Sequence, residues 1–168
     1  MYLPQFPIIM VTKKICAIFC IAFFISVTVL SQPLLDNIPQ IVDVELLKQA
    51  DSLKQFFELQ GFEMIKESTI AMKSQYEKPV IVSLKKGTWY RVCFIGDITS
   101  KLYEVRMYDW EEKRVVYEKQ KPKDLNKNII NYDYIPRFTE LHIIKPVQIN
   151  KKKKDVNGYI LLFKKIIK

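Results

Sequence analysis

Glycine, histidine and cysteine are all scarce in this chain of 168 residues, which holds four glycines, three cysteines and one histidine. With so few glycines, the sequence contains no glycine-rich loop of the kind that cradles phosphate groups. The single histidine, His142, excludes a metal site built from several imidazoles. No common catalytic motif is present, and no cofactor is expected.

Charge is missing from residues 15–30, an apolar run that directly follows Lys13 and Lys14. A basic segment, an apolar core and a small residue such as Ser31 have the layout of a secretory signal, so we expect residues 1–31 to be a signal peptide. The run is also short for a spanning helix, which needs roughly 20 apolar residues. The alternative is an uncleaved anchor, which the long basic segment and the lack of alanine at the cleavage positions favour. Cleavage predicts a periplasmic or secreted protein, and retention predicts an inner-membrane one anchored through residues 15–30.

Cleavage after Ser31 would remove 31 of the 168 residues and leave 137, enough for one domain with its own core. Cys16 and Cys20 leave with the signal, so the mature chain keeps only Cys93 and cannot form an internal disulfide. Because Cys93 lies in the middle of an apolar run, we interpret it as a small buried side chain. Packing must then stabilise the domain.

Positive charge is in excess, with a formal net value of +9. Much of it lies in residues 151–154 and in the C-terminal Lys164, Lys165 and Lys168. Basic runs can bind nucleic acid, anionic lipid or acidic glycan, but a solvated turn and tail is the interpretation we favour. Export argues against nucleic acid. The expected partner is therefore a protein or glycan of the cell envelope, with membrane contact only if residues 15–30 are retained.

One amphipathic helix is expected before the strands, after an extended leader that contains prolines. Asp43 has the type of a helix N-cap, and Gly61 stands where a C-terminal glycine belongs, so residues 32–61 are leader and helix. The apolar residues near one helical face are Leu46, Ala50, Leu53 and Phe57, and those expected to be buried are Leu47, Leu53, Phe56 and Phe57.

Apolar residues alternate along residues 79–110, which predicts three successive antiparallel strands separated by turns near Gly87 and Gly96. Side chains on a strand point to opposite faces in turn, so one face of each strand can be apolar. In the second strand we expect the face of Tyr90 to point inward. The residues that share these faces are Val80, Val82 and Leu84, then Tyr90, Val92 and Phe94, then Tyr103, Val105 and Met107.

Further strands are expected on both sides of this unit. Residues 62–72 fit either a strand or a short helix, and we favour a strand. Several short strands in one domain are typical of a sandwich or barrel. We therefore predict a mainly β domain over residues 62–168, an antiparallel β-sandwich or barrel of seven or eight strands. The later strand segments are residues 114–119, 129–134, 140–149 and 159–163.

Turn and core residues follow one another in a recognisable order through the second half of the chain. They are Lys86, Gly87 and Tyr90, then Gly96 and Asp97, then Leu102 to Met107 with Tyr108 and Asp109, then Ile135, Pro136 and Thr139, and finally Gly158, Tyr159 and Ile160. Over residues 79–163 this order resembles the bacterial peptidase pre-peptidase C-terminal domain, a secreted β-sandwich. The chain is also similar to uncharacterised exported proteins of Gram-negative bacteria that place a helix before such a sandwich.

The resemblance implies a jelly-roll-like or related antiparallel β-sandwich that serves as an accessory module, of the kind that often stands beside an exported hydrolase. The segment from Thr139 to His142 departs from the family, which usually has a Ser/Thr-Gly pair followed by Tyr there. Some related modules bind calcium through acidic loops. No metal site is expected in this chain, because its acidic residues lack the spacing of calcium ligands; they are Asp97, Asp109, Glu111 and Glu112.

Four aromatic residues near strands or turns are the candidate ligand-binding residues: Trp89, Tyr103, Tyr108 and Trp110. Exposed aromatics can form a stacking platform for a sugar or a peptide, although sheet aromatics more often pack against their neighbours. The expected function is that of an exported, non-enzymatic accessory or interaction module of the bacterial cell envelope. The alternative is a carbohydrate- or peptide-binding module that uses these aromatics.

A small hydrolase is the third hypothesis, and it would rely on His142 or on the acidic turn that contains Glu111. We expect His142 to face solvent or to lie at a sheet edge without catalytic partners. The acidic turn is expected to be solvated, with Lys113 and Arg114 neutralising its charge.

Overall fold

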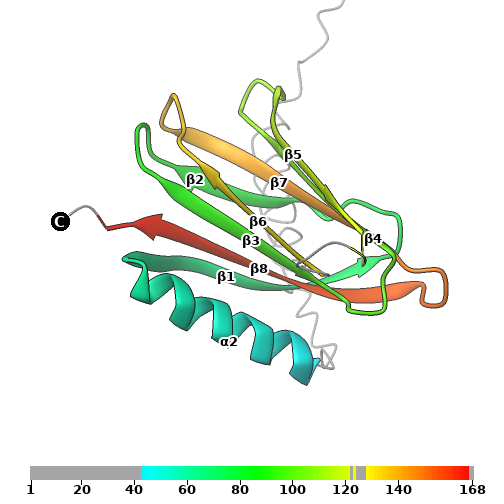
Figure 1. Ribbon diagram of the computed structural model, residues 1–168. Helices are drawn as coiled ribbons and strands as arrows, with labels where there is room; N and C mark the ends of the chain where they lie inside the picture. The colour runs from blue at the N-terminus through cyan, green and yellow to red at the C-terminus, as the bar shows by residue number, and fades with distance from the viewer. Residues whose placement is uncertain (1–42, 122, 124–127, 167–168) are drawn as a thin grey trace, which may run out of the picture. The chain divides into compact units, whose positions relative to one another are not determined.

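The computed structural model describes residues 43–121, 123 and 128–166 (Figure 1). The expected signal peptide over residues 1–31 and the leader that follows it lie outside the described residues. Within the described residues the chain forms one helix and eight strands, and no helix there is long and apolar enough to cross a membrane. The elements are α2 (Val44–Leu59), β1 (Phe62–Lys73), β2 (Val80–Leu84), β3 (Tyr90–Gly96), β4 (Leu102–Tyr108), β5 (Arg114–Gln120), β6 (Ile129–Tyr134), β7 (Glu140–Ile149) and β8 (Asp155–Lys165).

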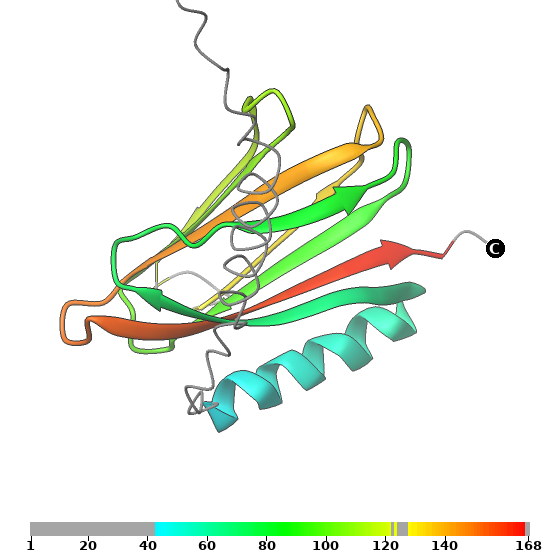
Figure 2. The same ribbon diagram turned by 180° about the vertical axis from the view of Figure 1, so that it is seen from behind.

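The strands form two antiparallel four-stranded sheets, with the orders β1-β8-β3-β6 and β2-β7-β4-β5. The pairs β1 with β8, β2 with β7, β3 with β6 and β4 with β5 are those of one long hairpin rolled up on itself. This is the jelly-roll arrangement. Figures 1 and 2 show the two layers from opposite sides. The predicted mainly β, antiparallel sandwich is confirmed.

The main core lies between the two sheets. Tyr90, Val92 and Phe94 of β3 point into it, as predicted from the alternation. Val105 and Met107 of β4 meet them from the other sheet, and both are fully buried. Burying an apolar side chain of this size stabilises a fold by roughly 1.5–3 kcal/mol, so this layer is the main source of stability.

Helix α2 covers the outer face of the β1-β8-β3-β6 sheet (Figure 1), where Phe57 packs on Cys93 and Phe163 in a second buried cluster. Strand β8 is therefore buried on both faces, which explains why residues 159–163 are continuously apolar instead of alternating. Cys93 is buried as predicted, and burial raises the pKa of its thiol to about 12. The thiol thus stays protonated at neutral pH.

Both ends of α2 agree with the sequence. The Asp43 carboxylate accepts a hydrogen bond from the backbone N–H of Glu45 at 3.0 Å, and Gly61 takes a φ of +74° just past the helix. The prediction that Leu47 and Phe56 are buried is wrong, because both are exposed. The helical period places them on the sides of the stripe that contacts the sheet. The buried stripe is formed by Leu46, Ala50 and Phe57, with Leu53 partly buried beside them.

Residues 62–72, which fitted either a strand or a helix, form most of strand β1 and confirm the favoured interpretation. Pairing decides the structure there, since β1 runs beside β8 along nearly its whole length. The register extends from Phe62 opposite Lys165 to Lys73 opposite Asp155, with an irregularity between Met64 and Lys66. This bulge explains why the apolar alternation is broken in the sequence.

The jelly roll gathers its connections at two opposite ends. The β2–β3, β4–β5 and β6–β7 connections lie at one end, over residues 85–89, 109–113 and 135–139. The β1–β2, β3–β4 and β7–β8 connections lie at the other, as Figure 1 shows. Because connections lack the ladder bonds of the sheets, these two ends are where surface side chains of different elements can converge.

Candidate binding cleft

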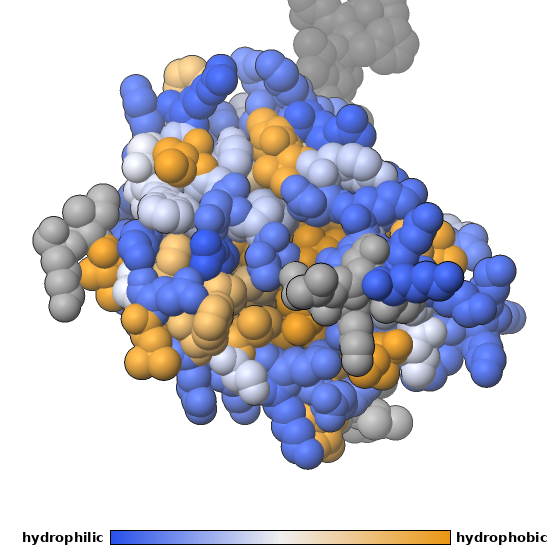
Figure 3. Space-filling model, viewed as in Figure 1, coloured by the Kyte–Doolittle hydropathy of each residue, from blue (hydrophilic) through white to orange (hydrophobic). Residues whose placement is uncertain are grey.

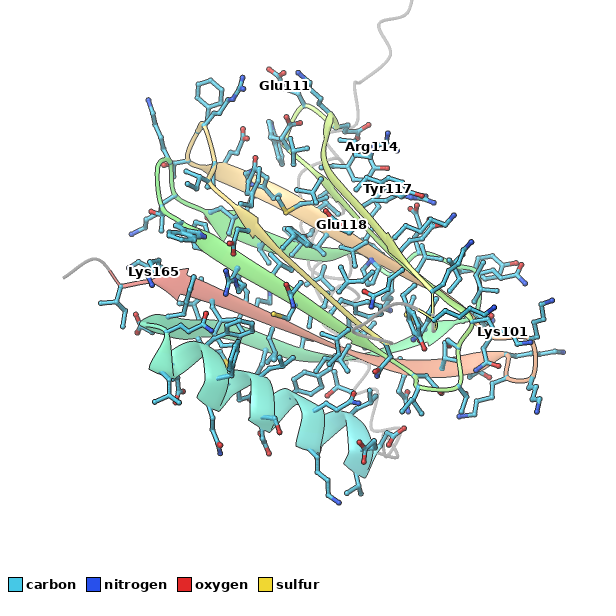
Figure 4. The ribbon with its side chains drawn as sticks, in the orientation of Figure 1. Lys101, Glu111, Arg114, Tyr117, Glu118 and Lys165 are labelled. Carbon is cyan, nitrogen blue, oxygen red and sulfur yellow. The ribbon has the colours of Figure 1, made fainter. Side chains whose placement is uncertain are left out.

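A cleft of about 400 Å³ opens where the β4–β5 and β6–β7 connections meet. We call it the end cleft. Figure 4 places Glu111 near the tip of the β4–β5 connection and Arg114 at the start of β5, with Tyr117 and Glu118 following along the strand. The cleft is lined by Asp109, Glu111, Lys113, Arg114, Val115, Tyr134, Ile135, Arg137, Phe138 and Glu140.

The β4–β5 connection is a tight turn closed by Asp109 and Lys113. The Asp109 N–H donates to the Lys113 carbonyl at 3.1 Å, and the Asp109 carboxylate accepts from the Lys113 N–H at 2.8 Å. Glu112 takes a φ of +59°, which lets the chain reverse. The turn is solvated as predicted. The Asp109 carboxylate, however, is hydrogen-bonded to the backbone N–H of Lys113 and not to its side-chain ammonium. The turn presents Trp110, of which 68% is exposed, to solvent.

The β6–β7 connection rests on the neighbouring β2–β3 turn. The Gly87 N–H donates to the Pro136 carbonyl at 2.9 Å, and the Lys86 N–H donates to the Thr139 hydroxyl at 3.0 Å. Gly87 has a φ of +72°, a conformation that favours glycine. Pro136 is buried, whereas Phe138 keeps 64% of its surface exposed. A fixed loop thus holds an apolar ring in the open.

Charges of both signs line the end cleft. Among the described residues, neither Arg137 nor Glu111 forms an ion pair or a side-chain hydrogen bond. The Arg114 guanidinium lies 5.0 Å from the centre of the Tyr117 ring. These groups are therefore available to a ligand without breaking an internal salt bridge.

The floor of the cleft is the Tyr134 side chain. Its hydroxyl lies 3.1 Å from Nε2 of His142, and a carboxylate oxygen of Glu140 lies 3.6 Å from the same nitrogen. Burial, with the carboxylates of Glu140 and Asp109, raises the pKa of Tyr134, and Arg137 opposes this shift. At neutral pH the Tyr134 hydroxyl therefore keeps its proton and acts as a hydrogen-bonding group.

His142 itself is fully buried, so the prediction that it faces solvent or a sheet edge is wrong. Strand β7 pairs with both β2 and β4 and is therefore a central strand. His142 lies on its inner face opposite Val82, on the same side as the buried Ile144. Its Nδ1 has no hydrogen-bond partner among the described residues. The imidazole thus adjoins two residues that line the cleft, Tyr134 and Glu140.

The four aromatics predicted from the sequence do not form one platform. Tyr103 is buried in the core, and its hydroxyl donates to the Asp97 carbonyl at 2.8 Å and the Ser100 carbonyl at 3.0 Å. Its role is structural, which contradicts its choice as a ligand-binding residue. Trp110 stands beside the end cleft, between lining residues of the β4–β5 turn.

Trp89 and Tyr108 lie apart from each other as well. The Trp89 ring packs edge-on against Phe62, with 5.7 Å between centroids, near the C-terminal end of α2. Tyr108 is partly buried, and the Lys145 ammonium lies 4.8 Å from the centre of its ring. The two rings thus have different neighbours, and Trp89 keeps 38% of its surface exposed.

Sequence reasoning missed the residues of the β6–β7 connection, Ile135, Arg137 and Phe138. The available signal was a proline turn flanked by large apolar residues, which a purely structural loop does not need. No group of three His, Cys, Asp or Glu side chains that could hold a metal ion occurs within the part of the chain that the structure describes.

Comparison with known proteins gives no family. No family model matches the sequence, and no curated protein matches it. Among solved structures, the chain is similar to the glycosylation-associated protein (Gap123) complex from Streptococcus agalactiae, with 17% identity and a TM-score of 0.31, over 62% of this chain and 39% of that one. The resemblance to the pre-peptidase C-terminal domain stays a prediction.

Two further structures are comparably distant. The P-domain of Penaeus vannamei nodavirus has 14% identity and a TM-score of 0.32, over 59% of this chain and 96% of that one. Drosophila melanogaster CENP-C bound to CAL1 has 8% identity and a TM-score of 0.28, over 73% and 99%. Likenesses of this size carry no argument about function. What the fold itself defines is an eight-stranded antiparallel β-sandwich with one covering helix, counted over the described residues.

Proposed function

We propose that this protein is an exported, non-enzymatic binding module of the bacterial cell envelope, and that it holds an extended peptide segment of a partner protein in the end cleft. The observation that carries the proposal is that Arg137 and Glu111, which have no charged partner among residues 43–121, 123 and 128–166, line one cleft with the exposed ring of Phe138. A peptide offers charges of both signs and apolar side chains at short spacing, which is the chemistry that this cleft complements.

The size of the cleft is consistent with such a ligand. Its volume of about 400 Å³ falls within the range of roughly 300–1,000 Å³ that is usual for ligand pockets. The Tyr134 hydroxyl at its floor can donate or accept a hydrogen bond, as recognition of a peptide backbone requires. An interface of this kind commonly places an aromatic anchor such as Phe138 among polar groups.

A binding role is supported over catalysis by the position of His142. A general base must come within about 3 Å of the proton that it abstracts, directly or through one water. His142 is fully buried, and its Nε2 atom already lies 3.1 Å from the Tyr134 hydroxyl and 3.6 Å from a carboxylate oxygen of Glu140. Burial raises the pKa of Tyr134, so its hydroxyl stays protonated at neutral pH and is not available as a general base.

Export is part of the proposal and rests on the layout of residues 1–31. Intact mass and fractionation of the full-length gene product in a Gram-negative host provide the test. A mass short by about 31 residues in the periplasmic or secreted fraction supports export with cleavage. Full-length mass in the inner-membrane fraction would show that residues 15–30 are an anchor.

Peptide binding is tested by selecting phage-displayed random peptides on the immobilised full-length chain. Selected peptides are then synthesised with a fluorescent label, and their Kd values are measured by anisotropy. We expect Phe138→Ala and Arg137→Glu to weaken binding at least tenfold, since each removes a group that lines the cleft. The matched control is Phe56→Ala, which removes a ring of similar exposure, 54%, from α2. Failure to enrich any peptide, or equal loss in Phe138→Ala and Phe56→Ala, would contradict the proposal.

A glycan-binding module is the second candidate, and the exposure of Trp110 is the observation that favours it. A freely exposed indole can stack on the face of a sugar ring. Binding on a glycan array that disappears in Trp110→Ala but persists in Arg137→Glu would favour this candidate over the peptide.

A further inference from the structure

The end of the sandwich opposite the end cleft carries a dense group of lysines, which we call the lysine end. They come from three connections that lie far apart in the sequence, β1–β2, β3–β4 and β7–β8. Figure 4 places Lys101 there, away from Glu111 and Arg114, and Figure 3 shows hydrophilic residues covering the β7–β8 connection. The lysine end consists of Lys73, Lys101, Lys151, Lys152, Lys153 and Lys154, all exposed.

A buried asparagine ties the three connections together. The Oδ1 atom of Asn150 accepts hydrogen bonds from the Lys152 and Lys153 N–H groups, at 2.9 and 3.0 Å. Its Nδ2 atom donates to the Thr99 hydroxyl in the β3–β4 connection at 2.8 Å. Its backbone carbonyl accepts from the hydroxyl of Ser74 in the β1–β2 connection at 3.0 Å. One side chain and its backbone thus fix all three connections.

A second set of bonds extends this support under the lysines. Gln148, which is fully buried, accepts at its Oε1 atom from the Asp97 N–H at 2.8 Å and from the Ser100 hydroxyl at 3.2 Å. The backbone N–H of Lys101 donates to the Ile149 carbonyl at 2.7 Å. The lysines therefore stand on a rigid polar base, unlike those of a solvated tail.

Most of this positive charge is not neutralised within the protein. Only Lys153 forms an ion pair, with Asp97 at 2.9 Å, and the other five lysines have none among the described residues. Two other carboxylates lie nearby: Asp155 is at the start of β8 opposite Lys73 in the register, and Glu77 of the β1–β2 connection pairs with Arg106 and Lys145. Charges held close together without counter-ions favour a multivalent anionic partner.

Two exposed apolar side chains stand among the lysines. Tyr76 of the β1–β2 connection is 70% exposed, and Ile98 of the β3–β4 connection is 52% exposed. Tyr76 and Lys73 both border a hollow of about 400 Å³ that the β7–β8 lysines complete. Exposed isoleucine and tyrosine beside lysines are typical of segments that rest at the interface of a bilayer.

We propose that the lysine end docks on the surface of an anionic phospholipid bilayer. The lysine ammonium groups contact the lipid phosphates, while Ile98 and Tyr76 enter the interfacial layer. An acidic soluble partner would not require exposed apolar side chains between the charges, and this combination favours the bilayer. Docking by this end leaves the end cleft directed away from the membrane, so the two surfaces can be occupied together.

Lysine acetylation footprinting of the full-length chain tests the proposal. The chain is mixed with vesicles of phosphatidylcholine, with or without phosphatidylglycerol at equal total lipid, and acetylation rates are read at each lysine by mass spectrometry. The internal controls are Lys48 on α2 and Lys164 near the end of β8, both exposed and outside the lysine end. Because the rates are compared within one molecule, insertion of residues 15–30 into both kinds of vesicle does not affect the result.

We expect acetylation of Lys101, Lys151 and Lys152 to be about fivefold slower on the anionic vesicles, which corresponds to about 1 kcal/mol per lysine near an anionic surface. Lys48 and Lys164 should react equally on both. Sodium chloride at about 0.5 M should abolish the difference, because it screens the attraction. Equal rates at the lysine end on both vesicles would overturn the proposal.

Variants and a phosphate control exclude the remaining explanations. Lys151→Glu with Lys152→Glu should remove the protection of Lys101, whereas Lys48→Glu with Lys164→Glu, an equal change in net charge, should leave it. Ile98→Ser should weaken the protection without changing charge. If inorganic phosphate alone protects the lysine end as fully as the vesicles do, the site binds a free anion and the bilayer is not its partner.

Discussion

The guanidinium of Arg91 and the carboxylate of Asp133 form a two-point pair across neighbouring strands β3 and β6. Nε to Oδ1 measures 2.6 Å, and Nη2 to Oδ2 measures 2.7 Å. The two residues are direct register partners. The guanidinium also lies 4.9 Å from the centre of the Phe57 ring of α2, and its Nη1 donates to Gln60. Arg91 therefore joins the sheet to the helix that covers it.

Replacing Arg91 by alanine should lower the free energy of unfolding by about 1–2 kcal/mol, the range for a charged hydrogen bond that solvent partly screens. Urea denaturation at neutral pH measures the change. Arg114→Ala, which removes an exposed guanidinium that contacts only the Tyr117 ring among the described residues, is the matched control and should have a smaller effect. Equal losses would mean that the contacts with the helix contribute nothing.

The same pair predicts a pH dependence. Arg91 holds the pKa of Asp133 below its usual value, with burial opposing the shift. A carboxyl whose pKa is lowered by folding stabilises the native state most at neutral pH, and the contribution is lost as the pH falls toward that pKa. The stability difference between wild type and Asp133→Asn should therefore be constant above about pH 5 and shrink as the pH falls from there toward the lowered pKa of Asp133. A difference that is constant over this acidic range would contradict the pairing.

Gly158 in β8 should not tolerate even alanine. A Cβ atom there would lie 2.7 Å from a ring carbon of Phe94 and 3.3 Å from the carbonyl oxygen of Ile95. Overpacking of this kind typically destabilises a protein by about 1–3 kcal/mol. Thermal unfolding should show a clear fall in Tm for Gly158→Ala. Gly158→Ala combined with Phe94→Leu, which removes the opposing ring carbons, should lose less than the two changes added separately.

The local parts of the fold could be predicted because they depend on short-range chemistry. The Asp43 cap, the Gly61 end and the inward face of Tyr90 follow from residue type and spacing alone. One error lies where sheet order decides. His142 is itself polar, yet it is buried because β7 is a central strand. Strand order is a long-range property that the alternation does not contain.

The candidate cleft could be predicted only in part, for a related reason. Trp110 was identified from its place in a turn, and the turn does border the cleft. Arg137 and Phe138 were not identified, because they join the cleft only when the jelly roll brings two distant connections together. Tyr103, by contrast, was chosen as a ligand-binding residue but lies in the core. A hydrogen bond from its hydroxyl to the Asp97 carbonyl satisfies its polar end inside the core.

His142→Leu should change the free energy of unfolding by less than about 1 kcal/mol, although the side chain is fully buried. The substitution removes the hydrogen bond to Tyr134, but it also removes the unpartnered Nδ1 atom and fills a similar volume. His142→Ala is the contrasting variant, since it leaves a cavity and should lose about 2–4 kcal/mol. The free energies of unfolding of both variants, measured by chemical denaturation, distinguish the loss of packed volume from the loss of the hydrogen bond. A leucine variant as unstable as the alanine variant would show that the imidazole is needed for its hydrogen bond.

Among the charged residues that support the lysine end, Asp97 should contribute most to the free energy of unfolding. Burial opposes ionisation of this side chain, but the Lys153 ammonium and two hydrogen bonds from Thr99 outweigh it and lower the pKa of the carboxyl. Its stabilising effect is therefore complete at neutral pH and declines as the pH falls toward that lowered pKa.

Asp97→Asn should lower the free energy of unfolding by about 1–3 kcal/mol at pH 7, because a buried ionic hydrogen-bond network loses its charge. Asp51→Asn, at an exposed pair with Lys54, is the matched control and should change it by less than about 0.5 kcal/mol. Because Asp97 holds the base on which the lysines stand, its asparagine variant should also raise hydrogen exchange at the Thr99 and Lys153 amides, and unchanged exchange there would contradict the role assigned to this network.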